Sequence, residues 1–399
     1  MQRLHGTLQR YTWGTVDAIP AILGREPDGT PVAEYWLGAH ESSPSILPGI
    51  HNLPLSEHVA QRHEILGQKP LAAFGAQLPF LMKILSANQP LSIQAHPSRE
   101  QAQEGWAREN RENVPLHSPE RTYRDAWPKP EIMIAVEEFH TLAGFRDPIE
   151  TAEIFRGLGV ADSLGSVIGP LTERKGPAAL AEVFLDVLSL DGDRRLLVNE
   201  VAVAALQHRD DDGPVGEAAR TVLELDEHFP SDPGILAALL MNRLVLRPGE
   251  ALFVPAGEMH AHLRGTGIEV MANSDNVIRG GLTSKHIDVE ELIRVVHFVP
   301  TVPEVITPRR TRPGVLKYLT PCSEFEVWRL DLSSQPEPIR IPGRGSARIL
   351  LNIEGTATIS HVGETLALNK GEAAFISAED QDLQITGHGD VYGVSSGIR

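Results

Sequence analysis

Two patterns of apolar and polar positions alternate along this chain. From residue 1 to about 146, and again from 244, short apolar runs are separated by turns that contain Pro and Gly, which favours β-strands. Between 147 and 243 the apolar residues recur instead every three or four positions, which favours amphipathic helices. The pattern therefore predicts a mainly β protein with a helical insertion.

Helices can be placed inside the insertion because their apolar residues share one face. These residues are Leu180, Val183, Phe184, Val187 and Leu188, then Leu196, Leu197, Val201, Ala204 and Ala205, and finally Ile235, Leu236, Leu239 and Leu240. A further short helix is predicted at 288–297, and the Pro-rich segment 300–314 is predicted to be a linker. The polar segment 98–128 is long for a loop, so we expect it to be partly helical or to cover a substrate.

An internal repeat connects two of the β regions. The run LRPGEALFVPA at 246–256 is echoed by LNKGEAAFISA at 368–378, with an offset of 122 between Gly249 and Gly371. The same offset places Asp382 at the position of His260, and the later region has no Gln-x-His pair. We infer two related barrels, of which the first alone binds metal. The alternative is that Gly-Glu-Ala recurs by chance in unrelated turns.

Composition and charge limit the number of domains, the possible partners and the cellular location that we expect. The 399 residues allow two or three domains, and 41% hydrophobic and 22% charged residues are ordinary for a soluble globular protein. A net charge of −17 disfavours nucleic acid and anionic membranes as partners. The single cysteine, Cys322, excludes an intrachain disulfide, and there is neither a signal peptide nor a long apolar run. We therefore expect a cytoplasmic protein.

Four residues in strand-like segments have side chains that can bind a metal. Gln94 and His96 lie two apart after an apolar run, so in an extended chain they would point to the same face. Glu131 begins another apolar run, and His260 follows a strand, turn and strand rhythm that is typical of a small β-barrel. Mixed nitrogen and oxygen ligands suit zinc or another borderline divalent ion with an open position.

Longer motifs connect the chain to a known family. The segment GIEVMANSDNVIRGGLTSKHID at 267–288 is the longest match, and shorter ones are QRYTWG at 9–14, WLGAH at 36–40 and GWAREN at 105–110. On these motifs the chain resembles type I mannose-6-phosphate isomerases, which are zinc enzymes of the cupin superfamily. The resemblance extends from about residue 5 to about residue 298.

The resemblance implies roles for individual residues. Gln94, His96, Glu131 and His260 would bind one Zn²⁺ per chain, and the guanidinium of Arg279 would stabilise an enediolate during catalysis. His262 shares a face with His260 if the segment is extended, but the family usually has Tyr there. We therefore expect His262 to line the pocket without binding the metal.

The remaining candidates concern proton transfer and substrate binding. Lys129 precedes Glu131 by two residues and would face the metal, and burial of Glu269 would raise its pKa; the choice between them stays open. The simpler interpretation of Glu269 is a structural salt bridge. Lys83 and Lys285 are expected to contact the substrate, because a phosphate ester needs local positive charge in an acidic protein, and Ser92 could donate its hydroxyl to the same phosphate.

The chain departs from the family pattern before its third expected ligand. The family usually has DPNHKPE there, whereas this chain has DAWPKPE at 125–131, so Pro128 replaces a histidine. A mechanism that uses that histidine for proton transfer cannot operate here.

Together these observations predict two cupin-type (jelly-roll) β-barrels plus an α-helical domain. The expected boundaries are 1–146 with 244–299 for the metal-binding catalytic domain, 147–243 for the helical insertion and 315–399 for a degenerate barrel. The expected reaction interconverts D-mannose 6-phosphate and D-fructose 6-phosphate, in a monomer. The alternatives are a cupin isomerase that acts on another sugar and a non-catalytic sugar-binding cupin.

Overall fold

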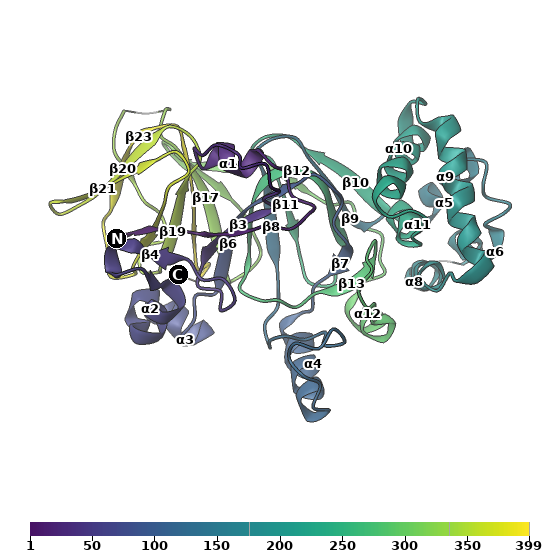
Figure 1. Ribbon diagram of the computed structural model, residues 1–399, viewed down its shortest axis with the longest axis horizontal. Coiled ribbons are helices and arrows are strands. Elements are labelled where there is room, and N and C mark those ends of the chain that lie inside the picture. The colour runs from purple at the N-terminus through teal and green to yellow at the C-terminus, as the bar shows by residue number, and fades with distance from the viewer. Residues whose placement is uncertain (175, 335, 399) are drawn as a thin grey trace.

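The computed structural model describes residues 1–174, 176–334 and 336–398. The molecule is elongated, with the strands of the C-terminal part at one end, the helices of the insertion at the other and further strands between them (Figure 1). Within the described residues, none of the helices combines the length and the apolar character that a membrane crossing needs.

The central strands form a large antiparallel sheet that we call the first β unit. One path through it runs β14-β11-β8-β12-β6-β3-β2, while β7, β9, β10 and β13 pair along the other side. Its strands are β2 (Thr7–Gln9), β3 (Glu34–Gly38), β6 (Phe80–Ala87), β7 (Ile93–Ala95), β8 (Glu131–Ala135), β9 (Phe139–Phe145), β10 (Met241–Leu246), β11 (Ala251–Val254), β12 (His260–Ala272), β13 (Ile278–Gly281) and β14 (Val305–Ile306). The long strand β12 is central because it pairs with strands on both sides.

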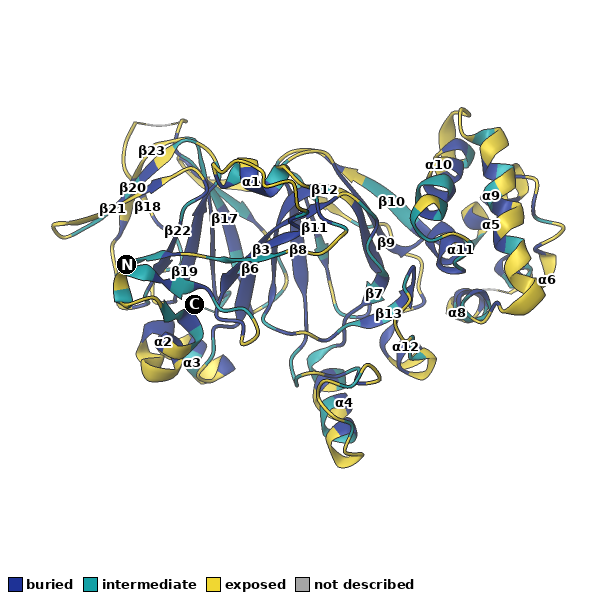
Figure 2. Cartoon of the chain, viewed as in Figure 1, coloured by how far each residue is buried: buried dark blue, intermediate teal, exposed yellow. Residues whose placement is uncertain are grey.

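The helices of the insertion pack together at one end of the molecule, beyond β9 and β10 (Figure 1). They are α5 (Pro148–Gly157), α6 (Gly165–Ile168), α7 (Pro170–Glu173), α8 (Pro177–Leu188), α9 (Leu196–His208), α10 (Gly213–His228) and α11 (Gly234–Leu239). The three predicted helices are confirmed as α8, α9 and α11. In α9 the outer face is exposed and the inner face buried, as the periodicity requires (Figure 2), whereas α11 is buried along its whole length.

The C-terminal strands form what we call the second β unit. One sheet runs β1-β22-β19-β24-β17-β16-β15, and a smaller one runs β18-β23-β20-β21. The strands are β1 (Gln2–Leu4), β15 (Arg309–Arg312), β16 (Val315–Tyr318), β17 (Glu326–Asp331), β18 (Ile339–Arg340), β19 (Arg348–Asn352), β20 (Thr356–His361), β21 (Glu364–Asn369), β22 (Ala373–Ile376), β23 (Gln384–His388) and β24 (Asp390–Ser395). The N-terminal strand β1 completes it by pairing Leu4 with Ala373.

The shorter elements lie around these units. They are α1 (Ala18–Ile22), β4 (Ile46–Leu47), β5 (Leu53–Pro54), α2 (Leu55–Gln61), α3 (Gln68–Phe74), α4 (Arg99–Arg111) and α12 (Val289–Val295). Helix α4 lies in the polar segment 98–128, and Ser98 begins it with a capping box in which Gln101 is the partner. That segment is therefore partly helical, and the helix predicted at 288–297 is α12.

The two units place equivalent strands in the same order. Strands β11, β8, β12, β6, β3 and β2 of the first unit correspond to β22, β19, β24, β17, β16 and β15 of the second. The repeated sequence forms the same turn before β11 and before β22: Gly249 and Gly371 have φ of 87° and 81°. In each turn the next glutamate accepts a backbone hydrogen bond, from Arg247 N at 2.9 Å or from Asn369 N at 2.7 Å.

The prediction of a linker at 300–314 is wrong. This segment contains β14, in which Ile306 pairs with Ala251, and β15, in which Arg309 pairs with Lys317. Both are edge strands, where a neighbouring proline removes no ladder hydrogen bond, so a Pro-rich composition is compatible with them.

Candidate metal centre

Three strands of the first β unit bring two histidines and a glutamate together in the interior. His96 follows β7, Glu131 begins β8 and His260 begins β12, and their side chains are 0%, 2% and 0% exposed. His96 Nε2 lies 3.2 Å from Glu131 Oε2, and His260 Nε2 lies 2.8 Å from Glu131 Oε1. The sequence placed these residues on separate strands, and the sheet places their ligand atoms side by side.

The inward-facing atoms of this cluster are acceptors. His96 Nδ1 is 2.8 Å from the carbonyl of Asn276, and His260 Nδ1 is 3.4 Å from that of Glu258, so the Nδ1 protons are held outward. Each Nε2 then presents a lone pair to the carboxylate. Glu131 Oε1 accepts no hydrogen bond from any described residue. Buried acceptors that face one another need a cation between them.

The geometry fits a tetrahedral divalent ion. Such an ion, with bonds of roughly 2.1 Å, holds its ligand atoms about 3.4 Å apart. One ligand atom from each of the three residues lies within 4.8 Å of the other two. Gln94 pairs with His260 across the sheet, and its amide nitrogen is 3.3 Å from His260 Nε2, so rotation of the amide would present its oxygen to the same point.

The charge states of the cluster also suit a metal. Burial and the nearby Lys129 ammonium lower the pKa of His96 to about 4, which keeps the imidazole neutral. Burial raises the pKa of Glu131, but Lys129 and the two imidazoles outweigh it and hold that pKa well below its usual range. A neutral imidazole and an ionised carboxylate are the forms that bind metals.

Lys129 reaches into the cluster, as its spacing from Glu131 suggested. Its Nζ is 3.0 Å from Glu131 Oε2 and 3.2 Å from His96 Nε2. The positive charge of Lys129, which lies in the loop before β8, therefore balances the negative charge of Glu131.

A second group of possible ligands, formed by Glu131, His262 and Glu269, has a different partner. Lys83 Nζ lies 2.8 Å from Glu269 Oε2 and 3.2 Å from Glu34 Oε1, so a lysine already supplies the cation there. His262 directs Nε2 towards Glu269 Oε1 at 3.6 Å. Lys129 plays a similar part beside Glu131 Oε2, but Glu131 Oε1 and the two imidazoles are left facing one another. The first group is therefore the candidate metal centre, and the expectation that His262 does not bind the metal stays a prediction.

The expectation of a raised pKa for Glu269 is wrong. Burial does raise it, but the Lys83 ammonium and the nearby His262 imidazole outweigh burial and lower the pKa of Glu269 to about 2. The simpler alternative, a structural salt bridge, describes its surroundings. Lys83 is itself 7% exposed and held between two carboxylates, so its expected contact with the substrate stays a prediction.

Arg279 lies beside the cluster on β13. It pairs with Gln94 of β7 across the sheet, and burial followed by the charge of Arg124 lowers the pKa of its guanidinium. Lys285 is in the loop after β13, where burial, Arg279 and Arg124 lower its pKa in turn. These three cations form the locally basic region that a phosphate ester would need. Ser92 lies just before β7, outside the strand.

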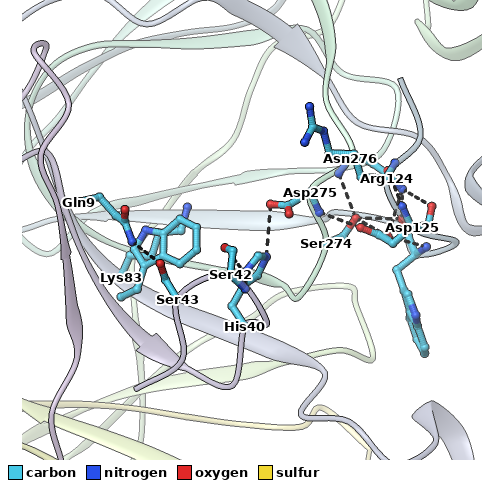
Figure 3. Close-up of polar contacts among 12 residues, drawn as sticks. Gln9, His40, Ser42, Ser43, Lys83, Arg124, Asp125, Ser274, Asp275 and Asn276 are labelled. Atoms are coloured by element: carbon cyan, nitrogen blue, oxygen red, sulfur yellow. Dashed lines mark hydrogen bonds and ion pairs between the residues drawn. The ribbon is translucent and has the colours of Figure 1, made fainter. Parts of the chain in front are cut away.

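Sequence reasoning missed the residues that hold His96 in place. Asn276 is 0% exposed; its side-chain oxygen accepts from Arg124 N at 2.8 Å, while its backbone carbonyl faces His96. Asp125 accepts from Ser274 Oγ at 2.8 Å and from Asn276 Nδ2 at 3.2 Å, which ties the loop before β8 to the loop after β12 (Figure 3). Such outer partners fix the orientation of a ligand.

A second contact that the sequence did not reveal holds the loop after β12 through Asp275. His40 Nε2 lies 3.3 Å from Asp275 Oδ1, and Ser42 Oγ lies 2.9 Å from His40 Nδ1 (Figure 3). The signal for His40, Asp125, Ser274, Asp275 and Asn276 was their presence in the motif segments, which did not reveal what each side chain touches.

Comparison with known proteins places both β units in one family. The family described as "Phosphomannose isomerase type I, catalytic domain" matches residues 1–148, and "Mannose-6-phosphate isomerase, cupin domain" matches residues 315–395. The mannose-6-phosphate isomerase of Escherichia coli is 34% identical over 394 residues, covering 98% of each chain. Mannose-6-phosphate isomerase 1 of Arabidopsis thaliana is 31% identical over 100% of this chain and 94% of the relative.

Solved structures agree with these sequence matches. A zinc-bound crystal structure of a mannose 6-phosphate isomerase is 31% identical, with a TM-score of 0.89 over 100% of this chain and 99% of that one. A mutant phosphomannose isomerase from Salmonella typhimurium is 32% identical, with a TM-score of 0.91 over both complete chains.

Proposed function

The chain belongs to the type I mannose-6-phosphate isomerase family, and from this we propose that it interconverts D-mannose 6-phosphate and D-fructose 6-phosphate with one bound zinc ion. The observation that carries the proposal is the buried cluster of His96, Glu131 and His260, whose acceptor atoms face one another at ligand spacing. A relative with bound zinc at TM-score 0.89 supports the choice of metal.

Four residues would hold the zinc: Gln94, His96, Glu131 and His260. A bound zinc ion would supply Lewis-acid chemistry, which polarises the oxygens of a sugar. The protein supplies the rest: Asn276 orients His96, and Lys129 balances the charge of Glu131.

Aldose–ketose isomerisation through an enediol needs a base near C1 and C2 and positive charge near the oxygen that becomes negative. Arg279 is suited to the second task because it carries a permanent positive charge on β13 and pairs there with Gln94 across the sheet. The choice of base between Lys129 and Glu269 stays open: Lys129 is held as an ammonium against Glu131, and a carboxylate with a pKa of about 2 binds protons weakly at neutral pH. If Lys129 is the base, Glu269 would hold Lys83 in position.

The phosphate is proposed to bind near Arg279, Arg124 and Lys285. Burial, and after it the neighbouring positive charges, lower the pKa values of Arg279 and Lys285, and a dianion among these cations would offset their repulsion. Ser92 and Lys83 remain proposed substrate contacts on the other side of the site.

The domain organisation is proposed to follow the two β units. Residues 1–146 with 244–299 would form a metal-binding cupin barrel, 147–243 a helical domain and 315–399 a second, metal-free cupin barrel. The shared strand order and the repeated turn support descent of both barrels from one unit. We propose that the chain acts as a monomer.

A coupled assay with mannose 6-phosphate tests the reaction and the metal together. Activity should disappear on chelation and return with added zinc, and His260→Ala should lose both zinc and activity while Glu138→Ala, which changes an exposed residue, keeps them. Absence of turnover in every metal state, or full zinc content in His260→Ala, would contradict the proposal.

A further inference from the structure

The second β unit contains a pocket that the isomerase reaction does not use. Its volume is about 650 Å³, and β15, β16, β17 and the segment from β18 to residue 344 line it. We call it the basic pocket, because its charged lining residues are Arg312, Lys317, Glu326, Arg340 and Arg344. It shares no residue with the candidate metal centre.

The positive charges in this pocket are only partly balanced. Lys317 Nζ is 2.9 Å from Glu326, and Arg340 forms an ion pair with Asp382. Arg312 donates instead to the backbone carbonyl of Arg340 at 2.7 Å.

Arg344 is also left without a carboxylate of its own. It donates to the amide oxygen of Gln381 at 2.8 Å and is 3.8 Å from Asp382, which Arg340 already holds. Four cations therefore face two carboxylates, in a protein whose net charge is −17. Burial and the charge of Arg340 lower the pKa of Arg312, which shows that the cations repel one another.

The position of the pocket supports a binding role. The strands β15, β16, β17 and β18 occupy the places that β2, β3, β6 and β7 occupy in the first unit. In the first unit β3, β6 and β7 carry Trp36, Lys83 and Gln94, which lie around the metal centre. The basic pocket is therefore the counterpart of the candidate active site.

One cross-strand pair shows how the chemistry has changed between the two sites. Trp36 on β3 lies opposite Lys83 on β6, with the ammonium 5.1 Å from the ring. At the same place in the second unit Lys317 on β16 lies opposite Trp328 on β17, so the lysine and the tryptophan have exchanged strands. Trp328 is 0% exposed and forms part of the floor of the pocket, and its Nε1 donates to no described residue.

We propose that the basic pocket binds a small phosphorylated metabolite, with the phosphate held by the arginines and the organic part in the remaining volume of the pocket. Guanidinium groups form paired, charge-assisted hydrogen bonds to phosphate oxygens, and the excess of cations supplies the attraction. The pocket would then be a second ligand site on an enzyme whose first site is the metal centre.

Calorimetric titration of the zinc enzyme with glucose 1-phosphate and with inorganic phosphate tests this proposal. The double variant R340A/R344A removes two pocket cations and leaves only the exposed Gln381 and Asp382 without these partners. Loss of two charge-assisted contacts should weaken binding at this site by at least about 10-fold. The ester should bind more tightly than inorganic phosphate, because its organic part makes further contacts in the pocket.

The control variant R174A/R209A makes the same change in net charge on exposed arginines of the helical insertion, and should bind like the wild type. The variant Arg279→Ala distinguishes binding at the metal centre from binding at the basic pocket, because it changes the first site and should leave the second intact. The proposal is overturned if R340A/R344A binds like the wild type, or if Arg279→Ala abolishes all binding of the ester. It is also overturned if the control weakens binding equally, since net charge alone would then explain the effect. None of these outcomes depends on turnover of mannose 6-phosphate.

Discussion

The two β units share an order of strands but place opposite charges at the same point. In the first unit Val254 lies opposite Glu131, and in the second the equivalent Ile376 lies opposite Arg348. A carboxylate offers only acceptors when ionised, whereas a guanidinium offers only donors. The first unit therefore needs an added cation at this point, and the second contains one of its own.

The environment of Arg348 shows the consequence. It is 1% exposed, its Nη2 donates to the carbonyl of Ser377 at 3.2 Å, and burial lowers its pKa to about 10. The guanidinium donates hydrogen bonds to backbone carbonyls, so this buried position needs no metal. The exchange of Glu131 for Arg348 is therefore one of the differences that would restrict the metal to the first unit, beside the absence of a Gln-x-His pair in the second.

The largest effect is expected from Glu131→Gln, which removes the ionised ligand that distinguishes the first unit. Altering an outer partner of a metal ligand costs roughly 10- to 100-fold in affinity, and removal of a ligand should exceed that, so zinc and activity should both be lost. Metal content after dialysis and the coupled assay measure the two effects. Retention of one zinc per chain would mean that Glu131 is not a ligand, and Glu138→Gln provides a control for the substitution itself.

Arg279→Ala should produce the next largest change, because it removes charge stabilisation while leaving the ligands in place. Loss of one preorganised donor typically lowers kcat by about 100- to 1,000-fold. Zinc content should remain that of the wild type, and Arg209→Ala, an exposed arginine, should change neither quantity. A near-normal kcat would limit Arg279 to positioning the substrate.

The charge of Glu269 should make the stability of the first unit depend on pH, whereas Gly393 stands at the equivalent place in the second. The folded-state pKa of about 2 lies below the usual value of roughly 4.3, so the stabilisation is complete above pH 4.3 and is lost as the pH falls towards 2. The maximum is about 3 kcal/mol. Urea unfolding of the metal-free wild type and of Glu269→Gln should show a difference that shrinks over this range; a constant difference would contradict it.

Asp125→Ala tests whether the loop network orients His96. Zinc affinity should fall by roughly 10- to 100-fold, and Asp125→Asn should recover part of it because an amide oxygen can still accept from Ser274. Competition with a zinc chelator gives the affinity. The exposed Asp210→Ala is the control. An unchanged affinity together with reduced stability would indicate that the network is structural only.

The smallest effects are expected at the repeated turn. Removal of the backbone hydrogen bond by Glu250→Ala or Glu372→Ala should each cost about 0.5–1.5 kcal/mol in the free energy of unfolding. Glu372 also forms an ion pair with Arg3, which should add up to about 1 kcal/mol and make its effect larger. Chemical unfolding of both variants measures this, and a larger loss at Glu250 would show that the two turns are not equivalent.

Local patterns were sufficient for much of the fold. The apolar spacing around Val183 predicted α8, and the Gly-Glu-Ala repeat marked equivalent turns in both units. Helices α5 and α10 were not placed individually. The segment 300–314 was misassigned because composition cannot reveal that a Pro-containing strand lies at the edge of a sheet.

The candidate site, like the fold, combines features that the sequence predicted with features that only the tertiary structure revealed. The sequence by itself determined the ligand types and their motifs, because imidazole and carboxylate groups at fixed spacing carry metal chemistry wherever they are found. Only the tertiary structure decided that Asn276 orients His96, that Lys83 holds Glu269 ionised and that Arg348 stands where Glu131 would be. These relations join strands far apart in the chain, and the register of the sheets sets them rather than any local pattern.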